Sequence, residues 1–326
     1  AMRSFATRTL LLLLGLLCVA GEHALAQTVR VERLVDGPII YPGMDARMGS
    51  NIAGPSLIRV PDWVEDPLGR YYLYFADHRG TYIRLAYADD VAGPWTTYVS
   101  GTLQLEQSHF PVSCPPCAPA SAYVHIASPD VHVDDERRQI VMYVHGRDEG
   151  RQVTRAAVSR DGLQFVGRPE ILGRPYFRAF RHDDFVYALS MPGVVYRSRN
   201  GLSNFEEGPP LFNPNMRHSA LLKRDDRLFV FFTRREDAPE RIFVSSIDLS
   251  GDWRSWSETS PVEVLRPERA WEGARLPIEP SRGGAINVPV NQLRDPAIFE
   301  EDGRIYLLYA TAGERGIGLA EVHLEP

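Results

Sequence analysis

The chain has 326 residues, of which 44% are hydrophobic and 24% charged, a composition typical of a globular protein rather than a disordered one. Its length allows one large domain or two ordinary ones. A formal net charge of −6 and an isoelectric point of about 5.9 do not favour a nucleic-acid-binding surface, so no nucleic-acid partner is expected.

Residues 1–26 have the features of a secretory signal peptide. A basic start is followed by an apolar run, Leu10 to Ala20, that is too short for a typical membrane-spanning helix. Ala24-Leu25-Ala26 then forms a small-x-small cleavage site. We expect a mature chain that begins near Gln27 and resides in the periplasm or outside the cell. No other stretch has the pattern of a membrane span.

Five short runs of aromatic and β-branched residues recur along the rest of the chain, and each has the composition of a buried β-strand. They are Tyr71–Phe75, Ile140–Val144, Phe185–Leu189, Leu228–Phe232 and Ile305–Tyr309. A shorter run and a polar turn precede each of them, and a third run follows. The repeated unit is therefore an antiparallel sheet of three or four strands.

Repeated small sheets predict an all-β fold, a five-bladed β-propeller, because radial closure protects the sheet edges. The fifth repeat lacks an outer strand of its own, and we expect Val29 to Leu34 to supply it. An N-terminal strand would then close the ring. We predict one propeller domain over residues 27–326, with two separate β-domains as the alternative.

Two cysteines remain after residue 26, in the short segment Cys114-Pro115-Pro116-Cys117. An oxidising compartment permits a disulfide across this loop, and we expect a structural staple. A redox role would need a helix N-terminus near one thiol to lower its pKa, and the sequence pattern offers none.

The candidate functional residues follow from the geometry of a blade. The first strand of each blade starts near the central axis at one face of the propeller, and the loop between the second and third strands returns to that face. Polar side chains at these two places are expected to converge on one central pocket. They are Asn51, Ser56, 77–79, 128–130, His145, 177–178, 217–219, 234–237 and 294–296. The Gly- and Pro-rich stretch from Trp271 to Asn291 is expected to cover the pocket as a lid.

Asp130 and Asp295 head the predicted inner strands of the second and fifth blades. Two carboxylates across a pocket can act as acid and base in glycoside hydrolysis, at about 6.5–9.5 Å for inversion and about 5–5.5 Å for retention. The alternative is that each aspartate caps backbone amides at the start of its strand.

Arg178, Arg217 and Arg294 are expected at equivalent places on three blades, where their mutual repulsion favours a bound anion such as a sugar carboxylate or sulfate. Pairing with nearby carboxylates such as Asp295 or Glu236 is the alternative. Because neighbouring arginines lower the pKa of a carboxyl group, we expect Asp295 to act as a base rather than as an acid.

Two residues are candidate proton donors. His218 lies at the start of an inner strand and could donate a proton, bind substrate or ligate a metal. Glu272 lies in the lid, next to Trp271, which could stack on a sugar ring. Three residues at the ends of second strands are expected to contact the substrate: His78, His145 and Arg234. A metal site combining His218 with the two other histidines is a further alternative.

The blade pattern resembles the five-bladed propeller glycoside hydrolases of families 43, 32, 68 and 117. Ser128-Pro129-Asp130-Val131, followed by Ile140–Tyr143, resembles the second-blade segment of family 43, where the matching Asp tunes the pKa of the acid. Arg294-Asp295-Pro296 resembles the Arg-Asp-Pro of family 32, where the Asp stabilises the transition state, and the Asp-Pro of the family 43 base. His218 resembles the histidine that acts as the acid in family 117.

The sequence departs from family 43 at two places: Gly54-Pro55-Ser56 stands where that family has its base, and Arg178 stands in the region of the third-blade acid. The resemblance implies a divergent branch of glycoside hydrolases that works without a cofactor, although related propellers can hold a structural calcium ion in the central channel. The three arginines favour an acidic oligo- or polysaccharide as the substrate. A non-catalytic carbohydrate-binding propeller is one alternative. A polysaccharide lyase, with His218 or a tyrosine as base and arginine neutralising a uronate, is another.

Overall fold

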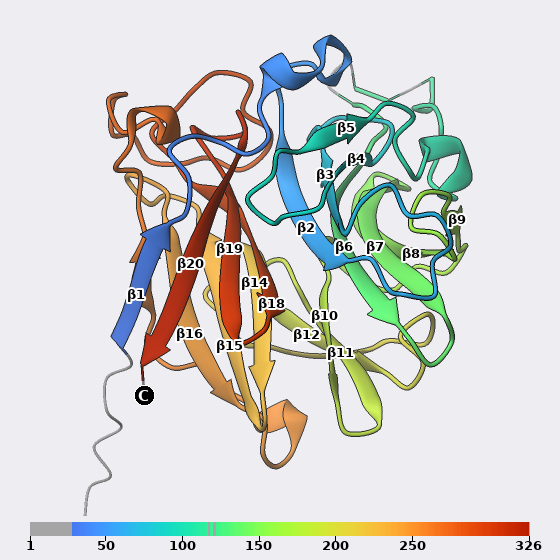
Figure 1. Cartoon of the computed structure of the whole chain (residues 1–326). Coiled ribbons are helices and arrows are strands. Elements are labelled where there is room, and N and C mark those ends of the chain that lie inside the picture. Colours follow the sequence, from blue (N-terminus) through green and yellow to red (C-terminus); the bar gives the residue numbers. More distant parts are fainter. Residues whose placement is uncertain (1–27, 117, 120–121, 326) are drawn as a thin grey trace, which may run out of the picture.

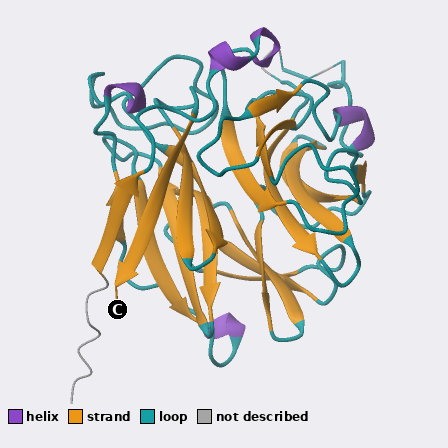
Figure 2. Cartoon of the chain, in the orientation of Figure 1, coloured by secondary structure: helices purple, strands orange, loops and turns teal. Residues whose placement is uncertain are grey.

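The computed structural model describes residues 28–325 except 117 and 120–121. Five four-stranded antiparallel sheets surround a central axis (Figure 1), so the predicted five-bladed all-β propeller is confirmed. The helices of the described residues are all short 3₁₀ turns (Figure 2). The predicted signal peptide and Cys117 lie outside the described residues, so the signal peptide and the disulfide to Cys114 stay predictions.

The blades follow the chain from the innermost strand to the outermost. Blade one is β2 (Ala53–Arg59), β3 (Tyr71–Ala76), β4 (Arg84–Ala88) and β5 (Thr96–Tyr98). Blade two is β6 (Ile126–Asp134), β7 (Gln139–Asp148), β8 (Arg151–Ser159) and β9 (Val166–Gly167). Blade three is β10 (Arg178–His182), β11 (Phe185–Ser190), β12 (Val194–Ser198) and β13 (Glu206–Pro210). Blade four is β14 (Met216–Arg224), β15 (Arg227–Arg234), β16 (Ile242–Asp248) and β17 (Val262–Leu265).

Blade five is closed by the N-terminal strand, as the sequence predicts. It consists of β18 (Arg294–Glu301), β19 (Arg304–Ala310), β20 (Ile317–Glu325) and, outermost, β1 (Thr28–Arg33). Strand β1 is antiparallel to β20, with Val29 opposite Leu324 and Arg33 opposite Ala320. This pairing joins the two ends of the described chain in one sheet.

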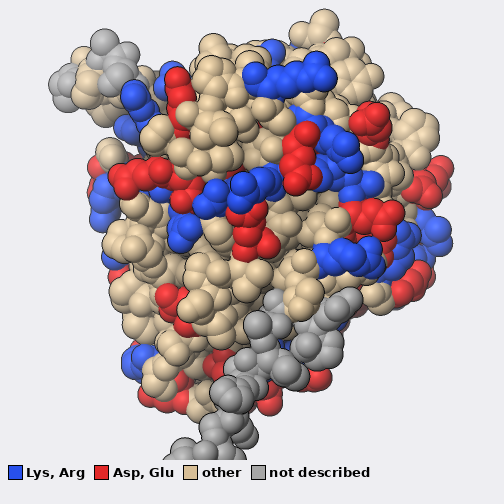
Figure 3. All heavy atoms as spheres, turned by 90° about the vertical axis from the view of Figure 1, so that its left-hand side faces the viewer, with Lys and Arg blue, Asp and Glu red and all other residues tan. Residues whose placement is uncertain are grey.

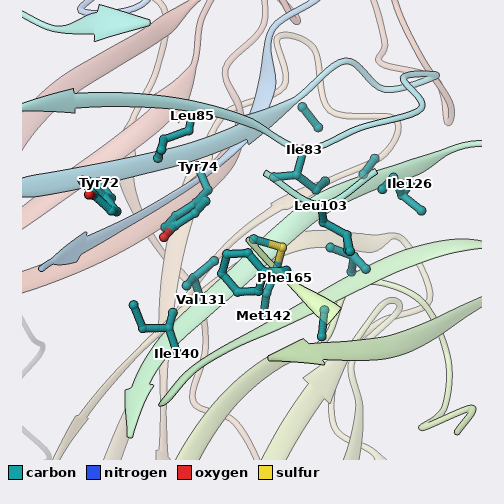
Figure 4. Packing of buried hydrophobic residues seen from close by; sticks show 14 of the residues in the cluster. Tyr72, Tyr74, Ile83, Leu85, Leu103, Ile126, Val131, Ile140, Met142 and Phe165 are labelled. Carbon is teal, nitrogen blue, oxygen red and sulfur yellow. The ribbon is translucent and has the colours of Figure 1, made fainter. Parts of the chain in front are cut away.

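The hydrophobic core consists of five clusters, each between two neighbouring blades. The cluster between blades one and two is shown in Figure 4, where Tyr74 packs edge-on against Phe165 with ring centroids 5.9 Å apart. The other four clusters join blades two and three, three and four, four and five, and five and one. Each sheet is therefore covered on both faces. This explains why the second strands are continuous apolar runs rather than alternating ones; all six residues of β3, for example, are buried.

Loops and short helices concentrate at the end of the propeller where the inner strands start, drawn at the top of Figure 1. The helices there are η1 (Pro42–Met44), η2 (Ala46–Met48), η3 (Leu105–Gln107) and η5 (Ala270–Glu272), whereas η4 (Trp253–Ser255) lies at the opposite end. None of the described helices is long and apolar enough to cross a membrane. On the side of the molecule shown in Figure 3, acidic and basic side chains are intermixed rather than gathered by sign.

Candidate active site

A cavity of about 330 Å³ opens at the end of the propeller where the inner strands start. Its walls come from the starts of inner strands, from loops between second and third strands, and from the segment between β17 and β18, the places that blade geometry predicts. The lining residues are His78, Gln152, Tyr176, Met191, Pro192, Met216, Arg217, His218, Arg235, Gly283 and Gly284. Of the predicted site residues, His78, Arg217 and His218 are among them.

The Asp295 carboxyl lies behind this lining, next to His218. His218 Nε2 is 3.2 Å from Asp295 Oδ1, and each side chain is only 1% exposed. The backbone N–H of Asp295 donates to His218 Nδ1 at 3.3 Å, so the ring proton belongs on Nε2, facing the carboxyl group. Thr233 Oγ1 lies 3.5 Å from the same Nδ1 atom. Both ring nitrogens of His218 therefore lie close to protein groups, Nδ1 to the backbone N–H of Asp295 and Nε2 to its carboxyl group.

Asp295 has a backbone conformation that two other blades share. Gly54, Ser128 and Asp295 each have positive φ, at 62°, 51° and 44°, and each precedes a proline. Each also lies in a bulge where the pairing of first and second strands shifts register. Of the three residues at this repeated bulge position, Asp295 is the one with a carboxylate.

Burial raises the pKa of Asp295 to about 6, and the nearby charge of Glu314 adds to the increase. The charges of His78, Arg217 and Arg294 oppose this increase without cancelling it. The arginines lower this pKa, as we expected, but desolvation outweighs them and the net shift is upward. Burial, together with the charges of Arg217 and Arg294, keeps the pKa of His218 well below its usual value, so this imidazole is neutral.

Two glutamates that the sequence analysis missed neutralise the arginines behind the cavity. Glu314, fully buried, accepts hydrogen bonds from Asn51 Nδ2 at 2.7 Å and from Arg294 at 2.9 Å, and its Oε1 is 3.2 Å from His78 Nδ1. Burial raises its pKa, but the contacts with His78, Arg294 and Asn51 outweigh it and leave the pKa at about 2. Glu314 is therefore a permanent negative charge.

Glu240, the second of these glutamates, is also fully buried and lies between two guanidinium groups, 3.2 Å from Arg217 and 3.3 Å from Arg294. Arg217 and Arg294 thus pair with carboxylates, which was the alternative to a bound anion. Their partners are Glu240 and Glu314, rather than Asp295 or Glu236. Both glutamates lie in loops between second and third strands. Blade geometry predicts that polar residues in these loops face the central pocket, although Glu240 and Glu314 were not selected from the sequence.

Arg178 occupies the channel between the inner strands rather than the cavity. Its guanidinium donates to the carbonyl of Ser219 on blade four at 2.9 Å and to that of Ser128 on blade two at 3.2 Å. These carbonyls would otherwise be oxygen donors for a cation. A positive side chain at this point does not fit a calcium ion in the channel, and the described residues contain no cluster of three or more His, Cys, Asp or Glu that could hold a metal.

Asp130 does not face Asp295 across one pocket. By strand register Asp130 is opposite Tyr143, just after the bulge, whereas Asp295 lies inside its bulge. Asp130 consequently lines a separate cavity of about 810 Å³ between the inner strands, which the candidate active site does not share. There it accepts from Ala179 N at 2.8 Å and lies 2.7 Å from His132 Nε2, so it caps a backbone amide.

Glu272 and Trp271 also lie away from the cavity lining. Glu272 is fully buried and forms a two-point ion pair with Arg33 of β1, at 2.7 and 2.8 Å, while Tyr309 Oη donates to it at 2.9 Å. Trp271 packs against the cluster between blades four and five. With its carboxylate engaged in this way, Glu272 has a structural position and is not placed to donate a proton to a ligand.

Further along the same segment, the chain does cover the cavity. Gly283 and Gly284 line it, and the carbonyl of Arg282 accepts a hydrogen bond from Arg217 at 2.9 Å. The lid predicted from Trp271 to Asn291 is therefore formed by its central residues rather than by its start.

The other two residues predicted to contact the substrate, His145 and Arg234, lie behind or outside the cavity lining. His145 is buried and stacks on Tyr176 with ring centroids 4.3 Å apart, and Tyr176 in turn packs on His218 at 5.1 Å. Arg234 lies 3.5 Å from Asp237, with its guanidinium over the ring of Phe243, outside the cavity lining. Tyr176, which the sequence analysis did not select, thus connects His145 to the cavity.

A curated relative establishes the family of the chain. The chain is 37% identical over 299 residues to "Uncharacterized protein R118" of Acanthamoeba polyphaga mimivirus, and the match covers 83% of each protein. The chain belongs to the family of R118. No protein-family model matches the chain.

Solved structures of glycoside hydrolases share the fold at low sequence identity. CoXyl43, a family 43 β-xylosidase/α-arabinofuranosidase from a compost metagenome, has a TM-score of 0.56 and 13% identity, covering 91% of this chain and 95% of that one. An endo-1,4-β-xylanase of Bacteroides thetaiotaomicron has a TM-score of 0.54 and 12% identity, with 83% and 89% covered. The chain therefore shares the five-bladed propeller fold of these glycoside hydrolases.

Proposed function

We propose that this protein binds an acidic saccharide in the 330 Å³ cavity and hydrolyses a glycosidic bond there, with Asp295 as the base or as the carboxylate that stabilises the developing positive charge. The observation that carries this proposal is the buried Asp295–His218 pair directly behind the cavity wall. The glycoside hydrolase-like fold supports the same reaction class.

The pKa of Asp295, about 6, suits this role. A group that transfers protons works best when its pKa is near the working pH, because both protonation states are then accessible. Above pH 6 the carboxylate is ionised and can accept a proton from an attacking water. His218 remains neutral, and its Nε2 atom lies 3.2 Å from Asp295 Oδ1, so the imidazole ring packs against the carboxylate.

One observation favours a second candidate function, a non-catalytic carbohydrate-binding propeller. Among the described residues that line the cavity there is no Asp or Glu, so a carboxylic acid to protonate the leaving group is not at hand. Such a protein would bind the saccharide and release it unchanged.

The lyase alternative receives less support. Burial raises the pKa of Tyr176 well above its usual value, so its phenol stays protonated and is a poor base, and both ring nitrogens of His218 face protein groups. We also propose, from the predicted signal peptide, that the protein acts in the periplasm or outside the cell.

Product formation from uronate-containing, sulfated and neutral oligosaccharides tests the proposal. New reducing ends without ultraviolet absorbance are expected with the wild type, and a loss of about 10²–10⁴-fold with Asp295→Asn. The rate should rise with pH through about 6. Absorbance from an unsaturated product would instead indicate a lyase. Binding without product from any saccharide would establish the binding protein.

A further inference from the structure

The cavity has two cationic side chains in its wall and no carboxylate among its described lining residues. Arg217 is only 3% exposed, and its Nε has no hydrogen-bond partner in the described part of the chain. Its one carboxylate, Glu240, is shared with Arg294. Because Arg217 lines the cavity, its guanidinium group can receive an acceptor from a ligand there.

Arg235 is the second cation, on the rim of the cavity. Its side chain is exposed and donates to the carbonyl of Pro214 at 2.9 Å, and it forms no ion pair with any described residue. Its stem lies beside Gly283, where a Cβ would be 3.6 Å from Arg235 Cδ. Arg235 therefore reaches the cavity from blade four, next to the covering segment.

The cavity is blind. Behind its wall Arg294 and Asp295 are at most 1% exposed and Glu314 is fully buried, while Arg178 lies across the channel. Its volume of about 330 Å³ is at the small end of ligand cavities, which span about 300–1,000 Å³. Met191, Pro192 and Met216 give part of the wall an apolar surface. A blind cavity of this size suits the end of a saccharide chain rather than its middle.

We propose that the cavity binds the terminal residue of a saccharide through an anionic substituent, a carboxylate or a sulfate, held by Arg217 and Arg235. This inference rests on the proposed saccharide site, and it names the substrate class and two specificity-determining residues. Guanidinium groups match carboxylate and sulfate oxygens in paired, charge-assisted hydrogen bonds, which a neutral sugar does not offer.

Calorimetric binding to Asp295→Asn, which prevents turnover, tests the inference. The probes are a disaccharide with a terminal glucuronate, its carboxyl-reduced counterpart, a disaccharide with a terminal sulfated sugar, and a trisaccharide whose only acidic residue is central. The terminal glucuronate or sulfate should bind at least about tenfold more tightly than the reduced disaccharide and the central-acid trisaccharide. The two acidic disaccharides distinguish carboxylate from sulfate.

Arg235→Gln, combined with Asp295→Asn, should lower the affinity for the terminal acidic disaccharides about tenfold. The affinity for the carboxyl-reduced disaccharide should stay unchanged. The matched control is Arg160→Gln. Arg160 is exposed and directly follows the far end of β8, whereas Gln152, which lines the cavity, lies near the start of that strand. The Arg160→Gln/Asp295→Asn variant should bind each saccharide as Asp295→Asn does. Equal affinity for acidic and reduced disaccharides, or for terminal and central acids, would overturn the inference.

The two proposals can fail separately. Tight binding of a terminal acid by the wild type without any hydrolysis would overturn the proposed hydrolysis and leave this inference standing. Hydrolysis of neutral saccharides without preference for acidic ones would leave the proposed hydrolysis standing and overturn this inference, together with the acidic substrate.

Discussion

His218 Nε2 lies 3.2 Å from Asp295 Oδ1, and the two residues come from the inner strands of neighbouring blades. The contact is formed because the bulge in β18 turns Asp295 out of the regular strand pairing, toward β14. A neutral imidazole and a buried carboxyl group with a pKa of about 6 then share one site. Ionisation of the buried Asp295 carboxyl group destabilises the folded state, and this effect can be measured as a dependence of stability on pH.

We expect Asp295→Asn to unfold at a higher denaturant concentration than the wild type at pH 8. The folded pKa of about 6 lies above the value of about 3.9 for an unfolded chain, so the folded state binds this proton more tightly. The stability that protonation confers is fully present below about pH 4 and is lost as pH rises through 6. At pH 8 the variant should be more stable by on the order of 2 kcal/mol, and the gap should close near pH 4.

Urea unfolding at pH 8, 6 and 4 measures this difference. Asp302→Asn is the matched control, because Asp302 also has positive φ, at 51°, but is exposed in a turn. The control should change stability little at any pH. A less stable Asp295→Asn at pH 8 would mean that the Asp295 charge is stabilised in the fold, contrary to our account.

Glu272→Gln should destabilise the protein without a specific loss of activity. The change leaves the Arg33 guanidinium without its two-point partner, and removing one member of a buried ion pair costs about 3–5 kcal/mol. Arg33 keeps Glu268 at 2.9 Å and is 11% exposed, so we expect the lower end of that range. Thermal unfolding measures the loss, and saccharide binding below the transition should be unchanged.

The double variant Arg33→Met/Glu272→Gln distinguishes a structural role of Glu272 from a catalytic one. If the role is structural, the double variant should recover part of the stability lost by Glu272→Gln, because no buried charge is then left without a partner and Glu268, which loses Arg33, is 57% exposed. A variant that keeps full stability but loses turnover would restore Glu272 as a catalytic candidate.

The fold could be predicted from the sequence because its signals are local. Each second strand is packed on both faces, so it is a continuous apolar run such as Tyr71–Ala76. The repeat of these runs gives the number of blades, and the missing outer strand of the fifth repeat indicates closure by β1. None of these inferences needed a contact between distant residues.

The site could be predicted only in part. Blade geometry selects the correct end of the propeller and brings His78, Arg217 and His218 to one cavity. It does not give the register inside a strand, and the bulge at Ser128 is what moves Asp130 to the other cavity. The partner of Glu272 could not be found either, because Arg33 is 239 residues away in sequence.

Gly54 provides a last prediction, and it bears on why the first blade has no carboxylate. Gly54 occupies the same bulge position as Asp295 and has a φ of +62°. A Cβ on Gly54 would lie 2.9 Å from Ser128 Cα, a backbone atom of the neighbouring inner strand. Blades one and two therefore approach too closely here for a side chain, unlike blade five, where Asp295 is accommodated.

Gly54→Ala should accordingly destabilise the protein by about 1–3 kcal/mol, because the left-handed backbone disfavours a Cβ and the contact with Ser128 overpacks the interface. Gly303→Ala is the matched control, since Gly303 also has positive φ, at 76°, but a Cβ there would meet nothing within 4 Å. Urea unfolding of both variants isolates the steric part as the difference between them. Equal losses would show that backbone conformation alone keeps glycine at position 54, and that space would permit a carboxylate in the first blade.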